Sequence, residues 1–356
     1  MNHLINRNKK ILYYLGIVII FLVILIYQPG FYHNVVIEVL AESNTNEIYD
    51  ESPNSEKDFV WMIGPWEKYP HNPILTAGDY DWESKNVLNP TAIVKEGKVY
   101  LFYRAQNDKR VSCVSLAISD DGYNFEKQSE PVLVPTEKYE FAGAEDPRIV
   151  EIDVIYYMTY TGWIYHTNYL CLAVSKDFIH WEKKGKILRD WPMASKSGAI
   201  VPEKINGKYY MYFGDTDIFV ATSENLIDWE PEIKPVLNRR FRKKDNGERY
   251  FDSLLVEPGP TPIITEQGIL LIYNGANFSK EYATGEVLFS LEDPRVVLKR
   301  TDVPVLEVDN ILEEKGEVNN VVFSEGLVQF KGKWFLYFGM GDSRIGVAVA
   351  DLKFIQ

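Results

Sequence analysis

Short runs of alternating apolar and polar residues dominate the chain, and they predict β-strands. Runs such as 97–106 (GKVYLFYRAQ) and 332–341 (GKWFLYFGMG) begin at a Gly-Lys turn and continue into aromatic and β-branched positions. These residue types favour strands when turn residues flank them. The periodicity of an amphipathic helix is nearly absent after residue 30. The pattern therefore predicts an all-β domain.

The strand pattern repeats along the domain. The repeated strands begin near Val99, Ile155, Lys208, Ile269 and Lys333, which are 53 to 64 residues apart. Repetition of small antiparallel sheets is the signature of a β-propeller. A β-sandwich is the alternative all-β architecture, but it would not repeat at this length. We expect a five-bladed β-propeller over residues 61–356, in which the two ends of the domain complete one blade.

The N-terminal region has a different pattern. Residues 11–27 are apolar apart from one glycine and three tyrosines, and they follow a basic stub at residues 1–10. A run of this length is near the lower limit for crossing a bilayer, and basic flanks stay on the cytoplasmic side. We expect a transmembrane helix at 11–27 that anchors an extracytoplasmic catalytic domain through an acidic linker at 28–60. A cleaved signal peptide is the alternative.

Charge and cysteine content exclude several classes of function. The formal net charge is −13, and three basic residues in the first thirty leave −13 − 3 = −16 for the remainder. So acidic a domain is a poor partner for nucleic acid. Cys113 and Cys171 form no CxxC motif, so we expect buried thiols and neither a zinc site nor a disulfide framework. No metal or cofactor motif is visible.

The candidate chemistry lies at the starts of the repeats. The innermost strands of a propeller direct their ends toward a central funnel, so polar residues from different blades converge there. Each repeat opens with a small-residue or proline turn that carries such residues: Asn89, Glu145 with Asp146, Lys196 with Glu203, Glu257, and Phe323 with Glu325. Arg104, Arg110 and Asp342 follow in the first and last repeats. We therefore expect one shared site.

An acidic funnel with an arginine and aromatic residues fits glycoside chemistry. Cleavage of a glycosidic bond needs a protonated carboxyl for the leaving oxygen and a second group opposite for the nucleophile. Crowded carboxylates raise one another's pKa, so one of them can stay protonated near neutral pH. The chain has no GxSxG motif and no phosphate-cradling glycine loop, so acyl transfer and nucleotide chemistry lack support.

At these positions the sequence resembles glycoside hydrolase family 130, the mannoside phosphorylases and β-mannosidases. The resemblance covers roughly residues 65–352 and rests on NPTA, YRA, GAEDPRI, VPEKINGKYYM, GPTP, YATG, VVFSEG and GDSRIGVA in that order. It implies a five-bladed propeller. It also implies that Asp146 is the general acid, with its proton passing through a sugar hydroxyl in phosphorolytic members. Asn89, Arg104 and Asp342, together with Arg110 and Phe323, would contact the mannose that is cleaved.

The resemblance also implies a basic trio for phosphate in the phosphorylases. Here Lys196 holds the first position, Gly214 the second and Asn274 the third. Carboxylates at Glu257 and Glu325 would add repulsion. A like-charge contact at about 4 Å and an effective dielectric of about 20 costs roughly 4 kcal/mol. This reasoning disfavours phosphate and favours water.

The sequence thus predicts an inverting β-mannosidase that acts on manno-oligosaccharides. Asp146 would be its acid, and Glu257 or Glu325 its base. One alternative is a β-mannoside phosphorylase that binds phosphate through Lys196 and another cation. Another alternative is a non-catalytic carbohydrate-binding propeller. The expected partners are an oligosaccharide substrate and, through the N-terminal helix, a membrane.

Overall fold

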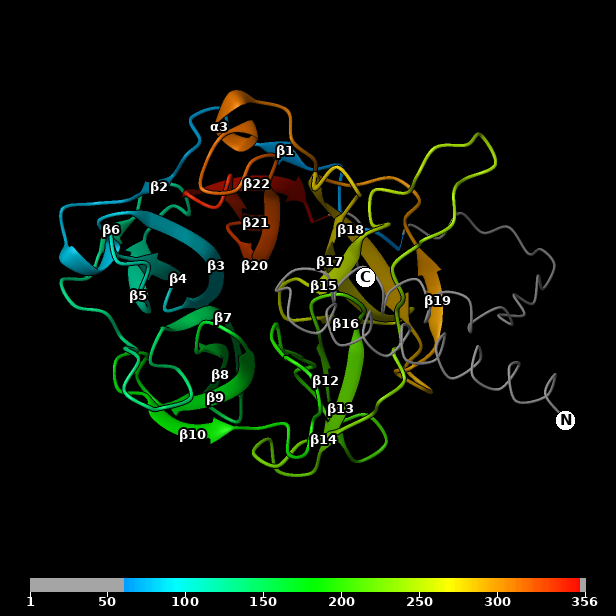
Figure 1. Cartoon of the computed structure of the whole chain (residues 1–356), viewed down its shortest axis with the longest axis horizontal. Helices are drawn as coiled ribbons and strands as arrows, with labels where there is room; N and C mark the ends of the chain where they lie inside the picture. The colour runs from blue at the N-terminus through cyan, green and yellow to red at the C-terminus, as the bar shows by residue number, and fades with distance from the viewer. Residues whose placement is uncertain (1–60, 353–356) are drawn as a thin grey trace, which may run out of the picture. The chain divides into compact units, whose positions relative to one another are not determined.

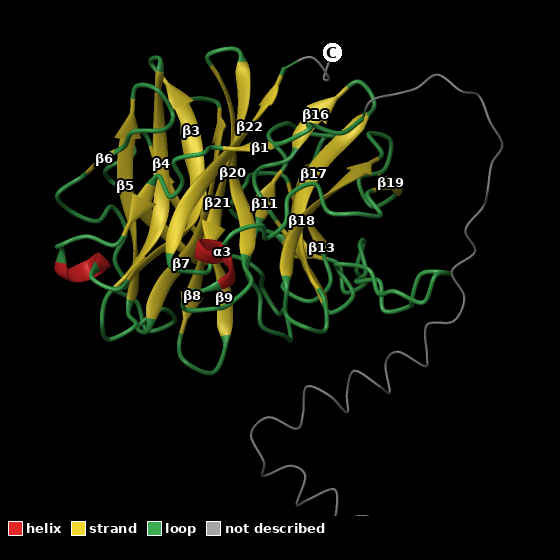
Figure 2. Cartoon of the chain, turned by 90° about the horizontal axis from the view of Figure 1, so that it is seen from above, coloured by secondary structure: helices red, strands yellow, loops and turns green. Residues whose placement is uncertain are grey.

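The structure, a computed structural model, describes residues 61–352, and these are almost entirely β-structure (Figures 1 and 2). Among them, helix is confined to two short elements, η1 (Asp81–Glu83) and α3 (Ile311–Glu314). The prediction of an all-β domain is confirmed.

Two antiparallel meanders form an eight-stranded sheet. The first comprises β3 (Asn86–Lys95), β4 (Lys98–Gln106), β5 (Ser112–Ser119) and β6 (Glu126–Lys127). The second comprises β7 (Gly143–Ile152), β8 (Ile155–Trp163), β9 (Asn168–Ser175) and β10 (Glu182–Lys186). One parallel pairing, between Ser112 and Gly143, connects the two meanders.

Three further sheets follow along the chain. The third meander comprises β11 (Ala199–Ile200), β12 (Tyr209–Phe213), β13 (Phe219–Ser223) and β14 (Glu230–Pro231). The fourth comprises β15 (Leu255–Pro258), β16 (Ile263–Thr265), β17 (Gly268–Ala276), β18 (Tyr282–Phe289) and β19 (Val297–Arg300). The fifth comprises β20 (Val322–Phe330), β21 (Lys333–Met340) and β22 (Arg344–Asp351).

The first strands of the domain complete this last sheet. Both β1 (Glu67–Lys68) and β2 (Leu75–Thr76) pair antiparallel with β22. The two ends of the described region therefore meet in one sheet, as the repeat suggested.

The sheets stand around a common centre in a propeller-like arrangement, and none of them closes on itself (Figure 1). The first strand of each meander, which is β3, β7, β11, β15 or β20, lies innermost, and β3 lies beside both β7 and β20. Apolar clusters fill the spaces between neighbouring sheets. For example, Phe102 of β4 packs with Tyr156 of β8 and with Phe178. Burial of such side chains, at about 1.5–3 kcal/mol each, holds the sheets together.

Buried tyrosine–carboxylate pairs recur within the meanders. In three of them a tyrosine on the second strand donates a hydrogen bond to a fully buried acid: Tyr103 to Glu83 at 2.8 Å, Tyr160 to Glu140 at 2.7 Å, and Tyr273 to Asp252 at 2.7 Å. Each acid also pairs with a cation on the outer strand, namely Lys127, Lys183 or Arg300. Each of these acids therefore connects two strands of its own meander.

The predicted anchor at 11–27 and the linker at 28–60 lie outside the described residues, so both stay predictions. Between residues 61 and 352 the structure contains no helix with the length and apolarity that a membrane span requires.

Candidate active site

Three innermost strands are interrupted by a β-bulge near their starts. The pairing of β3 with β4 shifts between Leu88 and Thr91, and that of β7 with β8 shifts between Glu145 and Arg148. The pairing of β20 with β21 shifts at Ser324. Bulges redirect side chains and are common beside active sites. Each bulge contains one predicted site residue, namely Asn89, Asp146 or Glu325, which has no partner in the strand register.

The backbone supports this reading at two of the bulges. Asn89 has φ 48° and Asp146 has φ 50°, and each precedes a proline. The left-handed region is unfavourable for residues with a side chain, although Asn and Asp tolerate it better than most. Two matching strained positions on neighbouring strands are typical of a functional site.

The structure brings together five carboxyl groups, which we call the acid cluster: Glu145, Asp146, Glu257, Glu325 and Asp342. Glu145, Asp146, Glu257 and Glu325 are buried, with at most 6% of their surface exposed, and Asp342 is partly buried. Three cations lie among them, Arg104, Arg148 and Lys196. Burying so many charges without partners would be prohibitive, so the pairing decides what the site can do.

Arg104 holds the two acids of the second meander. Its Nη2 lies 2.7 Å from Glu145 Oε1 and its Nη1 lies 3.1 Å from Asp146 Oδ1. Ser112 also donates a hydrogen bond to Glu145, at 2.9 Å. Burial raises the pKa of Glu145. Burial would also raise the pKa of Asp146, but Arg104, Lys196 and Arg148 together hold it below its usual range. Asp146 is therefore ionised in the free protein.

Lys196 links two sides of the cluster. Its Nζ lies 3.1 Å from Glu257 Oε1, and Ser197 donates a short hydrogen bond to the same oxygen. Glu257 and Asp146 both raise the pKa of Lys196 against the effect of burial, so Lys196 stays charged. Its side chain is 23% exposed, whereas that of Glu257 is 3% exposed. The group in this pair that solvent or a ligand can reach is thus the cation.

Arg148 closes the bottom of the cluster. Its Nε donates to Gly259 O, its Nη1 to Asp146 O and its Nη2 to Pro258 O, at 2.9, 3.2 and 2.7 Å. Nη2 also lies 2.7 Å from Glu325 Oε1. The contact of Arg148 with Glu325 is an ion pair between two buried groups, and both Arg148 and Asn89 lower the pKa of Glu325. Burial outweighs the nearby charge and raises the pKa of Glu325 to about 8.

Asn274 fixes the strand that carries Glu325. Its Nδ2 donates to Ser324 O at 2.9 Å, and Ser324 N donates to its Oδ1 at 2.7 Å. Thr284 and Ser324 share a hydroxyl hydrogen bond of 2.8 Å. Both polar atoms of the Asn274 side chain therefore bind the backbone of Ser324, and the side chain is fully buried.

Asp342 and Tyr282 complete the surroundings of Lys196. Asp342 lies in the turn after β21 with φ 50°, and burial raises its pKa to about 6. Burial and Glu257 also raise the pKa of Tyr282 at the start of β18, so its hydroxyl stays protonated. The sequence analysis named Glu145 only as one of the polar residues of the shared site and assigned no role to Tyr282 or Arg148, although all three lie in motifs that it singled out.

Three candidates from the sequence lie away from the cluster or only at its edge. Arg110 is 63% exposed and pairs with Glu317 at 2.6 Å. Glu203 is exposed, beyond the far end of β11. Phe323 is buried on β20, with its ring centroid 6.2 Å from that of Tyr282. Asn89 acts on the pKa of Glu325, so it belongs to the cluster.

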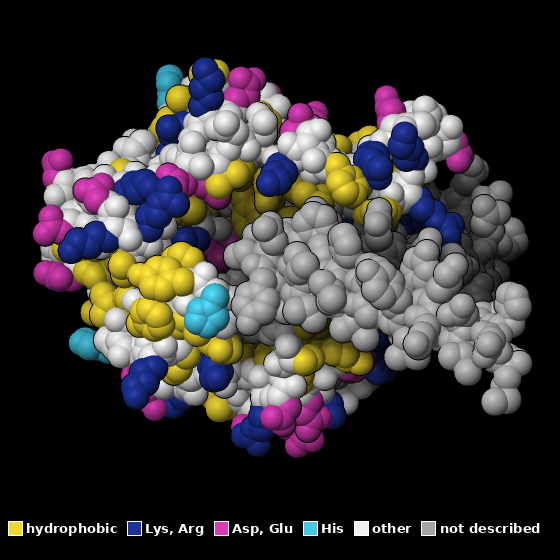
Figure 3. Space-filling model, viewed as in Figure 1, with side chains coloured by type: hydrophobic (Ala, Val, Ile, Leu, Met, Phe, Trp, Pro, Cys, Tyr) yellow, Lys and Arg dark blue, Asp and Glu magenta, His cyan; other side chains and the backbone are white. Residues whose placement is uncertain are grey.

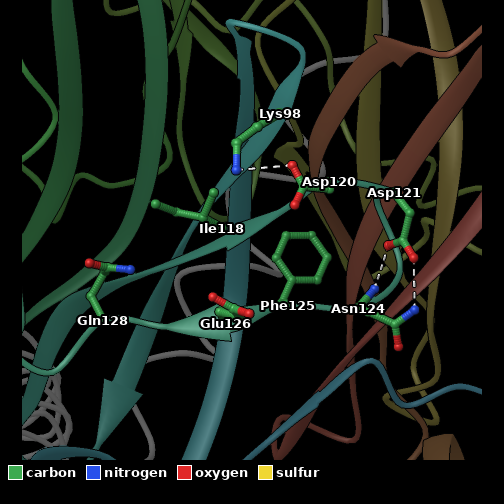
Figure 4. A pocket seen from close by; sticks show the side chains of 8 residues that line it. All are labelled: Lys98, Ile118, Asp120, Asp121, Asn124, Phe125, Glu126 and Gln128. Carbon is green, nitrogen blue, oxygen red and sulfur yellow. Dashed lines mark hydrogen bonds and ion pairs between the residues drawn. The ribbon is translucent and has the colours of Figure 1, made fainter.

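A separate pocket of about 410 Å³ lies at the opposite end of the first meander (Figure 4). It is lined by Lys98 at the start of β4, by the end of β5 and by β6. Lys98 pairs there with Asp120 at 3.0 Å, and both side chains are largely exposed. The pocket is therefore a solvated surface feature, far along β4 from Arg104. Within residues 61–352 no group of three or more potential ligands is arranged to hold a metal ion.

Comparison with known proteins identifies the class of protein that this fold and acid cluster define. The family profile of glycoside hydrolase family 130, described as beta-1,4-mannooligosaccharide phosphorylase, matches residues 66–356. The chain belongs to this family of mannoside-active enzymes.

Two relatives come from Thermoanaerobacter sp. (strain X514). A 1,2-beta-oligomannan phosphorylase is 38% identical over 297 residues, covering 80% of this chain and 96% of the relative. A beta-1,2-mannobiose phosphorylase is 36% identical over 306 residues, covering 80% and 97%. One similar solved structure is 32% identical to this chain, with a TM-score of 0.78, and the match covers 85% of this chain and 97% of that structure. It is described with the statement that this family of mannoside phosphorylases contains glycoside hydrolases that target beta-1,2 mannosidic linkages in Candida mannan.

The expectation that the chain is a hydrolase with Glu257 or Glu325 as base is corrected by the two Thermoanaerobacter relatives, because both are phosphorylases. The repulsion expected between phosphate and the two glutamates was overestimated. That expectation counted Glu257 and Glu325 as free negative charges, whereas the first pairs with Lys196 and the second lies against Arg148. The raised pKa of Glu325 removes most of its charge at neutral pH. The repulsion assigned to phosphate was therefore too large.

Proposed function

We propose that this protein is a phosphorylase that cleaves β-1,2-mannosidic bonds with inorganic phosphate and releases mannose 1-phosphate. The observation that carries the proposal is the position of Lys196, a charged and partly open side chain between Asp146 and Glu257. The activity of the similar enzymes supports the same reaction and linkage.

The proposed architecture is a five-bladed β-propeller. The five meanders around one centre support it, as does the pairing of β1 and β2 with β22. In that architecture the eight-stranded sheet is two blades joined by the single pairing of Ser112 with Gly143.

Asp146 is the proposed general acid. It must carry a proton when the glycosidic oxygen leaves, yet three cations keep it ionised in the free protein. Bound phosphate would offset these cations, and this raises the pKa of a neighbouring carboxyl. The reaction then needs no reactant other than the mannoside and phosphate. A phosphate oxygen attacks the anomeric carbon, and the glycosidic bond breaks. The proton from phosphate passes through Asp146 to the leaving oxygen. Attack opposite to the leaving group inverts the anomeric configuration.

Lys196 is the proposed phosphate ligand. An ammonium group has three hydrogen-bond donors, and among the described residues one carboxylate partner, Glu257, lies within ion-pair distance. The charges of Lys196 and Glu257 both affect the pKa of Tyr282, so its protonated hydroxyl lies near them. This hydroxyl can donate a further, neutral hydrogen bond to the phosphate. Asn89, Arg104 and Asp342 remain the proposed contacts to the mannose that is cleaved, with Phe323 packed beside them. Arg110 would act only from the edge.

The test is incubation of the full chain with β-1,2-mannobiose, with and without phosphate. We expect mannose 1-phosphate of inverted configuration, with turnover that rises with phosphate and saturates. Free mannose as the only product, at a rate independent of phosphate, would overturn the proposal. β-1,4-mannobiose in parallel tests the linkage.

We also propose that residues 11–27 anchor this enzyme at a membrane with the catalytic domain outside. The apolar run and its basic flank support this. Protease accessibility in intact and lysed cells tests it, because cleavage of residues 61–352 only after lysis would contradict the orientation.

A further inference from the structure

Three aromatic side chains, two of them exposed and one half-buried, lie together where β7 begins and β8 ends. We call Phe141, Trp163 and Tyr165 the aromatic platform. The ring of Tyr165 stands edge-on to both neighbours, with centroids 5.4 Å from Phe141 and 5.2 Å from Trp163. Phe141 is 53% exposed and Tyr165 is 63% exposed. Figure 3 shows hydrophobic side chains gathered on this face, over the part of the molecule where β7 and β8 lie.

The register of β7 and β8 places the platform at the open end of the site. Trp163 pairs with Gly143, and Ala142 N donates to Trp163 O at 3.0 Å. Glu145 of the acid cluster pairs with Thr161 on the same two strands. Two strand positions correspond to about 7 Å, so the platform begins that far beyond the cluster. Asp146 is five positions after Phe141 in the chain, which limits the full span to about 18 Å.

The backbone presents these rings outward in an unfavourable conformation. Tyr165 has φ 69°, in a short loop where Ile164 N donates to Thr167 O at 3.3 Å. A bulky residue in the left-handed region is a genuine outlier, and such strain gathers at sites that bind ligands. An exposed aromatic group that packing does not require has the same implication.

A sugar chain bound in the acid cluster can extend out of it at only one end. Arg148 and Glu325 close the bottom of the cluster, since their side chains are 1% and 0% exposed. A sugar chain with its terminal unit in the cluster must therefore leave through the open end, where β7 and β8 carry the platform. A span that begins about 7 Å from the cluster and extends to at most about 18 Å can accommodate the further units of a short oligosaccharide.

We propose that the aromatic platform is a binding subsite for mannose units beyond the bond that is cleaved, and that it makes the enzyme prefer β-1,2-linked oligosaccharides to the disaccharide. Aromatic faces carry negative partial charge and attract the C–H groups on the apolar face of a pyranose ring. This inference rests on the proposed function, because it takes the acid cluster as the place of cleavage.

The experiment compares the parent with Phe141→Ala, Tyr165→Ala and the double variant in the presence of phosphate. The measured quantity is the ratio of kcat/KM for β-1,2-mannotetraose to kcat/KM for β-1,2-mannobiose. We expect this ratio to fall about tenfold in the double variant. Tyr165→Phe keeps the ring and should keep the ratio. Val154→Ala is the matched control, because Val154 is 80% exposed in the turn at the other end of β7 and β8.

The outcomes separate the subsite from the reaction. Calorimetric titration of mannotetraose without phosphate measures the subsite even if no chain length is phosphorolysed, and a weaker affinity of the double variant supports it. An unchanged ratio together with an unchanged affinity overturns the inference. So does a change of oligomeric state in the double variant with the ratio preserved, because the platform would then be a protein contact. Thermal unfolding of each variant identifies any that fail to fold.

Discussion

The guanidinium group of Arg148 lies 2.7 Å from the carboxyl of Glu325, and neither side chain is open to solvent. The two residues come from β7 and β20, and the same guanidinium donates to carbonyls of Pro258 and Gly259 beside β15. Arg148 therefore joins three innermost strands directly beneath Asp146. One side chain therefore holds both the backbone of the proposed general acid, Asp146, and the carboxyl of Glu325.

Arg148 should be far more important for stability than its partner. Arg148→Met leaves three buried carbonyl oxygens without their donor, at about 1–3 kcal/mol each. Glu325→Gln replaces a carboxyl that is mostly protonated at neutral pH, since its pKa is about 8, and should cost less than about 1 kcal/mol at pH 7. Urea unfolding measures both. Glu203→Gln, at an exposed position, is the control for removal of a carboxylate. Equal losses for the two buried variants would refute this asymmetry.

Asp146→Asn should reduce kcat for β-1,2-mannobiose by about 10²–10⁴-fold, because a general acid contributes a factor of this size. An aryl β-mannoside with an acidic phenol as leaving group needs little protonation, so the loss should be much smaller with that substrate. Initial rates on both substrates test this. The same loss on both would mean that Asp146 positions the substrate and does not donate a proton.

Lys196→Met should raise the KM for phosphate more than tenfold and change the KM for the mannoside less. One charged hydrogen bond is worth about 1.5–3 kcal/mol, which corresponds to this factor. Lys196→Arg keeps the charge and should recover part of the affinity. Lys204→Met removes an exposed lysine of the same meander and serves as control. A rise confined to the KM for the mannoside would place Lys196 in the sugar site.

The sequence was sufficient for the strand repeat and for most of the cluster, because both follow from local patterns. The turns at Asn89, Asp146, Glu257 and Glu325 were visible as polar residues beside Pro or Gly, and the structure places all four at the centre. Which charges neutralise one another could not be predicted. The contact of Lys196 with Glu257 crosses two meanders, and spacing along the chain carries no information about it.

Burial was the second missing quantity. Glu140 and Glu257 look alike in the sequence, and the structure buries both. Glu140 stabilises a single sheet through Tyr160 and Lys183, whereas Glu257 lies in the acid cluster beside Lys196. Arg110 and Arg104 are both arginines near the end of β4, and only Arg104 points into the cluster. A pattern of residue types identifies candidates, but side-chain direction selects among them. The direction of Arg148 could not be predicted either, so its pairing with Glu325 was missing from the charge balance at the site.

A buried carboxyl outside the site gives the last prediction, which concerns pH. Glu286 on β18 is fully buried, and it accepts hydrogen bonds from Ile63 N at 3.0 Å and from Trp66 Nε1 at 3.5 Å. Its own N–H donates to Thr301 Oγ1. Burial raises the pKa of Glu286 from 4.5 to about 8, while the two hydrogen bonds lower it. The folded protein thus binds a proton here that the unfolded chain releases at lower pH.

The sign of the effect follows from this difference. Between about pH 4.5 and pH 8 the folded state holds more protons, so the free energy of unfolding falls as pH rises, by up to about 1.4 kcal/mol per pH unit from this group. Glu286→Gln does not ionise and should make the decline shallower by that amount. Urea unfolding at intervals from pH 5 to pH 9 measures both slopes. Glu266→Gln, an exposed position of the same meander, should leave the parent slope unchanged. Parallel curves for the parent and Glu286→Gln would mean that Glu286 is ionised in the folded protein throughout this range.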